Sequence, residues 1–177
     1  MMSVQRSRCV AAKVVPALLL ILGLIGPAIA DDWQTLAPEG KGFTVEMPTQ
    51  PEHRENLNDP ELFADVDDYG SPVGDGFVMA TVFDFEPAKR ALMSEGDVFK
   101  LGEAMVQPGC APTASRPLPG GPDAAVETDF ACPEGVRLRY RMHLLGDRLW
   151  RLAAGGPASI ADGDVADRFF RSFALSD

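Results

Sequence analysis

Apolar and polar residues alternate along several short segments of this chain, a pattern typical of strands with one buried face. Residues 43–47 alternate in this way, and residues 77–85 are rich in β-branched and aromatic side chains. Three further strand-like segments follow in close succession, at 124–132, 136–145 and 148–154. Gly146-Asp147 fits a two-residue hairpin turn between the last two. Weaker strand signals lie at 53–57, 62–69 and 113–118.

Two segments change to helical spacing. Residues 88–107 carry apolar side chains at helical intervals and end at Pro108-Gly109, before a Pro- and Gly-rich connection at 108–122. The last apolar set, from Ile160 to Phe173, lines one side of a closing helix. We expect Phe169 and Phe173 to point into the sheet, with Phe170 at the margin of that face.

This order of elements predicts the fold class. Strands, one helix, a run of strands and a closing helix describe an α+β domain. The connections between the later strands are too short for crossovers, so we expect a mostly antiparallel sheet flanked by helices.

The first thirty residues predict export. Arg6, Arg8 and Lys13 precede an apolar stretch at 14–25, and Ala28-Ile29-Ala30 stands before Asp31. This is the pattern of a signal peptide cleaved after Ala30, which leaves residues 31–177 as one α+β domain, periplasmic or secreted. The alternative is an uncleaved membrane anchor, although the 17 uncharged residues from Val14 to Ala30 lie at the lower limit for a membrane span.

The net charge of the mature chain limits the kinds of partner that we expect it to bind. The predicted signal takes three of the 16 basic residues and none of the 26 acidic residues, so the mature chain has a net charge of −13. Phosphate contacts need a basic surface, and this balance therefore argues against nucleic acid. Contact with a membrane is expected only through an uncleaved signal peptide.

The mature chain keeps two cysteines, Cys110 and Cys132, because Cys9 leaves with the signal. In an oxidising compartment two cysteines most simply form one disulfide. Neither has a histidine nearby in the sequence, so a structural bond is favoured over a catalytic thiol.

Two segments at opposite ends of the mature chain carry a family resemblance. The first is Trp33 followed by Pro38-Glu39-Gly40-Lys41-Gly42-Phe43-Thr44-Val45-Glu46-Met47-Pro48. The second includes Gly146-Asp147-Arg148-Leu149-Trp150-Arg151-Leu152, Gly156-Pro157 and Ala166-Asp167-Arg168-Phe169-Phe170-Arg171-Ser172-Phe173. With the order of elements, these segments resemble small secreted bacterial proteins with a PsbP-like fold. The resemblance implies an antiparallel sheet with helices packed on its faces. It does not supply residues for the cofactor-related roles of PsbP.

One strand presents a candidate ligand face. Arg137, Arg139, Arg141 and His143 share one side of the strand at 136–145, and the hairpin register sets His143 opposite Trp150. A cationic stripe beside an indole suits an anionic or aromatic ligand. The alternative is a solvent-facing surface whose arginines pair with Glu127 and Asp129 on the neighbouring strand.

Motifs for catalysis or metal binding are weak. A cation site is conceivable at Asp65, Asp67, Asp68 and Asp75, although a solvated acidic loop fits these residues better. The only histidines, His53 and His143, are tied to no nucleophile or zinc motif. We therefore expect a non-enzymatic binding or accessory domain of the cell envelope, without a cofactor, whose partner is an unknown envelope protein or a small ligand. The alternatives are a small-molecule or metal-binding module that uses the Arg139/Arg141/His143/Trp150 face, and a hydrolase with scattered site residues.

Overall fold

The computed structural model describes residues 33–55, 61–119 and 124–176. The predicted signal peptide and its cleavage site at Ala30 lie outside these residues.

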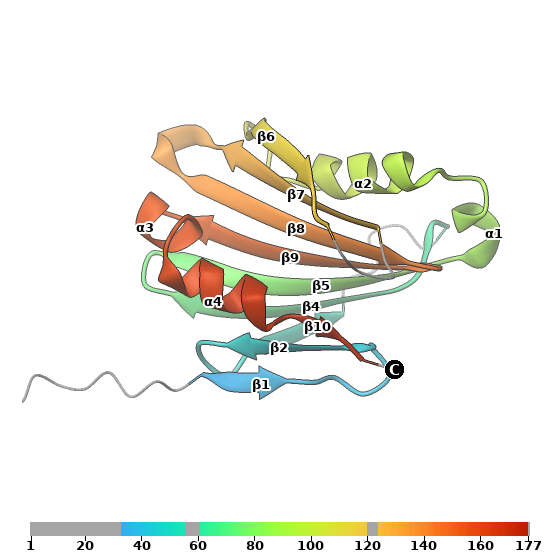
Figure 1. The fold of residues 1–177 in the computed structure, drawn as a ribbon, viewed down its shortest axis with the longest axis horizontal. Helices are drawn as coiled ribbons and strands as arrows, with labels where there is room; N and C mark the ends of the chain where they lie inside the picture. The colour runs from blue at the N-terminus through green and yellow to red at the C-terminus, as the bar shows by residue number, and fades with distance from the viewer. Residues whose placement is uncertain (1–32, 56–60, 120–123, 177) are drawn as a thin grey trace, which may run out of the picture. The chain divides into compact units, whose positions relative to one another are not determined.

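A seven-stranded sheet forms the centre of the fold, and every neighbouring pair in it is antiparallel (Figure 1). Its strands in spatial order are β3 (Glu52–Glu55), β4 (Phe63–Val73), β5 (Gly76–Phe85), β9 (Arg148–Gly156), β8 (Arg137–Leu145), β7 (Ala124–Ala131) and β6 (Ala111–Pro117). The predicted α+β class with a mostly antiparallel sheet is confirmed.

A smaller layer packs on one face of this sheet. It contains the three-stranded sheet β1 (Gln34–Leu36), β2 (Phe43–Met47) and β10 (Ala174–Leu175), together with the closing helices α3 (Ala158–Ala161) and α4 (Asp164–Ser172). Strand β2 and helix α4 share one core cluster with the sheet: Phe43, Val45, Phe169 and Phe170 meet Val78, Val82 and Leu152.

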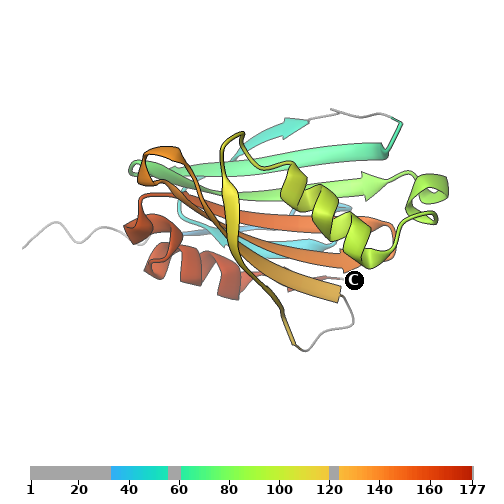
Figure 2. The same cartoon turned by 90° about the horizontal axis from the view of Figure 1, so that it is seen from above.

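The opposite face carries helix α2 (Glu95–Ala104), which follows the short helix α1 (Pro87–Arg90). Val98 of α2 is fully buried in a second cluster that contains Phe83 and Leu149 of the sheet. Figure 2 looks onto this face: α2 lies across part of it, whereas β3 and β4 have no helix over them in this view.

The predicted single helix over 88–107 is wrong, because the chain forms two helices there. Ser94 begins the second helix with a capping box: its Oγ accepts from the Asp97 backbone N–H at 3.2 Å, and the Asp97 carboxylate accepts from the Ser94 N–H at 3.2 Å. A capping box satisfies N–H groups only at a helix start, so it separates α2 from α1. In the predicted connection at 108–122, the weaker strand signal at 113–118 corresponds to β6.

The expected burial of the closing phenylalanines is also wrong in part. Phe169 and Phe170 are both buried, at 0% and 1% exposure, while Phe173 is only partly buried. Helix α4 ends at Ser172, and the backbone of Phe173 is extended. Helical spacing therefore does not apply to Phe173, which instead stacks on Phe43 with ring centroids 5.9 Å apart.

Candidate functional site

The predicted arginine face lies under helix α4. Strand pairing sets Glu127 opposite Arg141, and Arg141 donates to that carboxylate from Nε at 3.0 Å and from Nη2 at 2.7 Å. Arg139 Nε lies 3.4 Å from the same carboxylate, and Arg139 Nη1 donates to Asp167 of α4 at 3.1 Å. Both guanidinium groups lie about 5 Å from the Phe170 ring centroid. The arginines thus join the sheet to the helix.

The solvent-facing alternative for this surface holds only in part: the side chain of Arg137 is 45% exposed, but those of Arg139 and Arg141 are mostly covered. The side chains of Arg139 and Arg141 are 16% and 20% exposed, and that of Glu127 is 2% exposed. Pairing with Glu127 was expected, but Asp129 pairs with Arg116 of β6 at 3.2 Å. Residue alternation shows which side chains share one face of a strand. It does not show which other element covers that face.

Glu127 remains charged despite its burial. Burial alone raises the pKa of its carboxyl, but the hydrogen bond from Arg141 and the positive charges of Arg139, Arg141 and Arg116 outweigh it, so the pKa falls below its usual value. The cluster holds Arg116, Arg139 and Arg141 against Glu127, Asp129 and Asp167, so its formal charges balance. A balanced cluster gives no net attraction for an anionic ligand.

The remaining members of the predicted face lie apart from this cluster. The His143 ring packs on Phe173 with centroids 4.7 Å apart, and Arg137 lies 3.9 Å from Asp162. Trp150 is 5% exposed, and its indole N–H donates to the Lys41 carbonyl at 2.9 Å. Trp150 also lines a cleft of about 330 Å³, formed with Pro38, Gly40, Gly42, Leu145, Arg148, Leu175 and Ser176. Arg137, Arg139, Arg141 and His143 are not among the residues that line this cleft.

Lys41 pairs with two of the four residues of the predicted cation site, Asp65 and Asp67, whereas Asp68 accepts from Thr81. The Lys41 Nζ lies 2.6 Å from Asp65 Oδ2, in contact with Asp67, and 3.6 Å from Asp84 Oδ2. Asp67 also contacts His53 Nε2 at 2.6 Å. Among the described residues, no group of three or more His, Cys, Asp or Glu side chains is arranged to hold a metal ion. A lysine ammonium supplies the positive charge instead.

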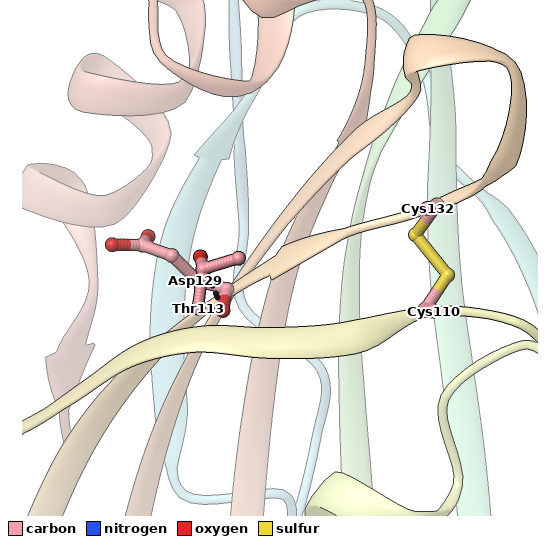
Figure 3. Close-up of a disulfide and its surroundings, with 4 residues drawn as sticks. All are labelled: Cys110, Thr113, Asp129 and Cys132. Atoms are coloured by element: carbon pink, nitrogen blue, oxygen red, sulfur yellow. Dashed lines mark hydrogen bonds between the residues drawn. A yellow bond between two sulfur atoms is a disulfide. The ribbon is translucent and has the colours of Figure 1, made fainter.

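Cys110 and Cys132 form a disulfide in the structure (Figure 3). Cys110 directly precedes β6 and Cys132 directly follows β7. Next to it, Thr113 Oγ1 donates to the Asp129 carbonyl at 3.1 Å, and the β6–β7 register shifts between Pro112 and Ala114. The disulfide therefore holds the end of an edge strand whose pairing is irregular. Cys110 and Cys132 pack against the cluster that contains Phe130, Leu138 and Tyr140.

A cleft that the sequence did not predict lies on the α2 side of the sheet, over the strands without a helix. Its volume is about 300 Å³, and it is lined by Glu52, Arg54, Asp68, Gly70, Ser71, Pro72, Phe77, Val78 and Met79. We call it the β4–β5 cleft. The Phe77 ring forms part of the apolar lining of this cleft. The ring packs so closely on the Gly155 backbone that a Cβ atom on residue 155 would come within 2.6 Å of it. Arg54 and Glu52 pair with each other at its rim, 2.7 Å apart.

Arg151 is a buried cation close to this cleft. The residue is 6% exposed, and its guanidinium lies 5.0 Å from the Phe83 ring centroid and 5.1 Å from that of Tyr140. Nη2 donates to Thr81 Oγ1 at 3.4 Å, while Nε and Nη1 have no hydrogen-bond partner among the described residues. Sequence reasoning overlooked Arg151, although it is the one charged residue within the segment Leu149–Gly156.

Comparison with known proteins defines the fold. No protein-family model matches the chain, and no curated protein sequence matches it. The structure is similar to the solution structure of cyanobacterial PsbP (CyanoP) from Synechocystis sp. PCC 6803, with a TM-score of 0.55. That similarity covers 87% of this chain and 98% of CyanoP at 10% sequence identity. The chain has a PsbP-like fold.

A second structure, of LpqN involved in cell envelope biogenesis of Mycobacterium tuberculosis, matches at a TM-score of 0.38. It shares 14% identity over 83% of this chain and 80% of LpqN, which is too weak a likeness to carry an argument. In residues 33–55, 61–119 and 124–176, none of the helices has both the length and the apolar character that crossing a membrane requires.

Proposed function

We propose that this protein is a non-catalytic binding domain of the cell envelope and that its binding site is the β4–β5 cleft. Support for a place outside the cytoplasm comes from the signal-like residues 1–30 and from the disulfide between Cys110 and Cys132. The acidic balance of the chain supports a protein or small-molecule partner over nucleic acid.

The β4–β5 cleft is the observation that carries this proposal. Ligand sites are usually concave, largely apolar and bounded by a few polar groups. Here Phe77, Met79 and Pro72 supply the apolar lining, and Glu52, Arg54 and Asp68 supply the polar groups. Its volume of about 300 Å³ lies at the lower end of the range for small-molecule sites.

The edges of the large sheet are poor alternatives as docking sites. Edge strands bind partner segments through unpaired backbone groups. Strand β6 contains Pro112 and Pro117, which have no N–H to donate, and β3 is four residues long with the sequence Glu-His-Arg-Glu. Prolines, charges and short length all disfavour strand addition, which leaves the face of the sheet as the better surface.

The contacts of His53 favour binding over catalysis. His53 contacts Asp67 and stacks on Tyr69 with ring centroids 4.7 Å apart, while His143 packs on Phe173. A general base in nucleophilic catalysis needs a Ser, Cys or Thr nucleophile within hydrogen-bond reach. The groups next to His53 are instead the Asp67 carboxylate and the Tyr69 ring.

Gly70 allows a direct test of the cleft. It lies on β4 in the cleft lining, and a Cβ at this position would meet no atom within 4 Å. Gly70→Leu should therefore fill the cleft without disturbing the sheet. Gly96→Leu, on the exposed surface of α2, is the matched control because its nearest atom would be 3.8 Å away.

Each variant would be tagged, recovered after export, and used to capture components of an envelope extract for mass spectrometry. We expect a protein or small molecule held by the wild type and by Gly96→Leu but lost from Gly70→Leu. A component retained equally by all three would place binding elsewhere. N-terminal sequencing of the same material should begin at Asp31; a chain that begins earlier would contradict cleavage after Ala30.

A further inference from the structure

The guanidinium of Arg151 lies over two aromatic rings, but most of its hydrogen-bond donors are unused. Phe83 and Tyr140 lie about 5 Å from its carbon, within the range of cation–π contacts. Those contacts do not satisfy the N–H groups, which lie in the plane of the guanidinium and require acceptors. In the part of the chain that the structure describes, Nε and Nη1 have no acceptor, and Nη2 has only a long bond of 3.4 Å to Thr81.

A buried cation in this state is costly to the fold. Desolvation by burial lowers the pKa of Arg151, although nearby Tyr140 and Asp68 act in the opposite direction. Replacement of a buried charge by an apolar side chain of similar size is often neutral or stabilising. Residues that break a rule of folding in this way are concentrated at functional sites. We therefore expect the hydrogen-bond acceptor for Arg151 to come from a ligand outside the chain.

Hydrogen bonds through Thr81 connect Arg151 to the lining of the β4–β5 cleft. Its Nη2 donates to Thr81 Oγ1, and Thr81 Oγ1 donates to Asp68 Oδ1 at 2.6 Å. Asp68 lines the cleft, as does Met79, which stands two residues before Thr81 on β5. Methionine side chains are unbranched and adapt to different neighbours, so Met79 is the lining residue that we expect to move when a ligand reaches Arg151.

The charges of Arg151 and Asp68 favour a ligand with a neutral head group. Arg151 carries one positive charge, and Asp68, linked to it through Thr81, carries one negative charge. A ligand anion would add an unbalanced charge beside Asp68, and a ligand cation would add one beside Arg151. A neutral carbonyl oxygen accepts hydrogen bonds from the guanidinium and leaves the balance unchanged.

We propose that the β4–β5 cleft binds an amphiphile with a neutral carbonyl head, whose oxygen accepts hydrogen bonds from Arg151 and whose apolar body lies on Phe77 and Met79. This inference rests on the proposed binding function of the cleft and adds the chemical class of its ligand.

The test compares three probes that share an eight-carbon chain: octanamide, octanoate and octylamine. Their affinities for the exported protein would be measured by calorimetry. We expect octanamide to bind at least about tenfold more tightly than either charged probe. Arg151→Met should weaken octanamide binding by about tenfold or more, the effect of losing a hydrogen bond from a charged donor. Arg151→Lys keeps the charge and loses the planar guanidinium. Its affinity for octanamide should therefore lie between those of the wild type and of Arg151→Met.

Thermal unfolding separates a ligand-binding arginine from a structural one. Without ligand, Arg151→Met should keep or raise the Tm, because it removes a buried charge that the fold leaves unpaired. A lower Tm, or a chain that does not fold, would make Arg151 a structural residue and overturn the inference. Tighter binding of octylamine, or unchanged binding of octanamide to Arg151→Met, would also overturn it.

Gly70→Leu makes the two proposals distinguishable. If Gly70→Leu abolishes octanamide binding and Arg151→Met does not, the cleft is the binding site and the role of Arg151 is wrong. If octanamide does not bind the wild type, the ligand class is wrong, and the capture experiment with Gly70→Leu still decides the proposed function.

Discussion

Glu127 and Arg141 form a two-pronged ion pair beneath helix α4, with the Nε and Nη2 atoms of the arginine 3.0 and 2.7 Å from one carboxylate oxygen. Arg141 Nη1 also donates to the Phe170 carbonyl at the end of α4, at 3.0 Å. The pair therefore connects β7, β8 and the closing helix.

Removal of Glu127 should destabilise the fold strongly. Glu127→Ala would leave Arg139 and Arg141 under the helix without their shared carboxylate, and breaking a buried pair in this way costs about 3–5 kcal/mol. Urea unfolding measures the loss. Glu52→Ala is the matched control, because Glu52 pairs with Arg54 at the surface with 71% of its side chain exposed, and exposed pairs contribute about 0–1 kcal/mol. Equal unfolding midpoints for the two variants would show that the buried pair does not hold α4 in place.

The same carboxylate should make stability depend on pH. The pKa of Glu127 lies below its ordinary value of 4.5, so the folded protein binds this proton less readily than the unfolded chain does. The resulting stabilisation is fully present above about pH 4.5 and is lost as the pH falls through the lowered folded pKa. Unfolding free energies measured by urea between pH 3 and pH 7 should decline on the acid side, and Glu127→Gln should reduce the slope. An identical slope in this variant would assign the acid sensitivity to other carboxylates, such as Asp67.

The sequence predicted the strands better than the helices because alternation is local and strand pairing follows from short turns. Gly146-Asp147 set the register of His143 opposite Trp150, as the structure has it. The break between α1 and α2 depends on the side chain of Ser94, which the apolar spacing does not report. Spacing also placed Phe173 on a helix that ends one residue earlier.

The candidate site was harder to predict, because it depends on what covers each face of the sheet. Alternation correctly grouped Arg139 with Arg141, yet only the fold shows that α4 lies on them. The lining of the β4–β5 cleft comes from three strands, β3, β4 and β5, on the face that α2 covers only in part (Figure 2). Arg151 gave a local signal as a charge within an apolar strand, but its unpaired N–H groups become apparent only in the packed structure.

The closing phenylalanines should differ in their contributions to stability. Phe169 is fully buried between α4 and the sheet, so Phe169→Ala should cost about 3–5 kcal/mol. Phe173 is partly exposed, and Phe173→Ala should cost less because fewer of its contacts exclude water. Unfolding free energies of the two variants check this order. A larger loss for Phe173→Ala would mean that Phe173 contributes more to the core than its burial indicates.

The disulfide should stabilise the domain measurably. It closes a segment with a sequence separation of 22, for which the chain-entropy model gives about 3 kcal/mol. Non-reducing peptide mapping should find the peptides of Cys110 and Cys132 linked, and reduction should lower the unfolding free energy by about 2–5 kcal/mol. Free thiols in the exported protein would contradict the bond.

Amide chemical-shift mapping of the exported protein, with and without the soluble part of an envelope extract, tests the binding cleft most directly. If the β4–β5 cleft is the binding site, the largest shifts should fall on Gly70, Phe77 and Met79, which line it. The same extract should leave the amides of Phe77 and Met79 unmoved in Gly70→Leu. Shifts confined to Gly40, Trp150 and Leu175, which line the other cleft, or the absence of any shift, would contradict the account.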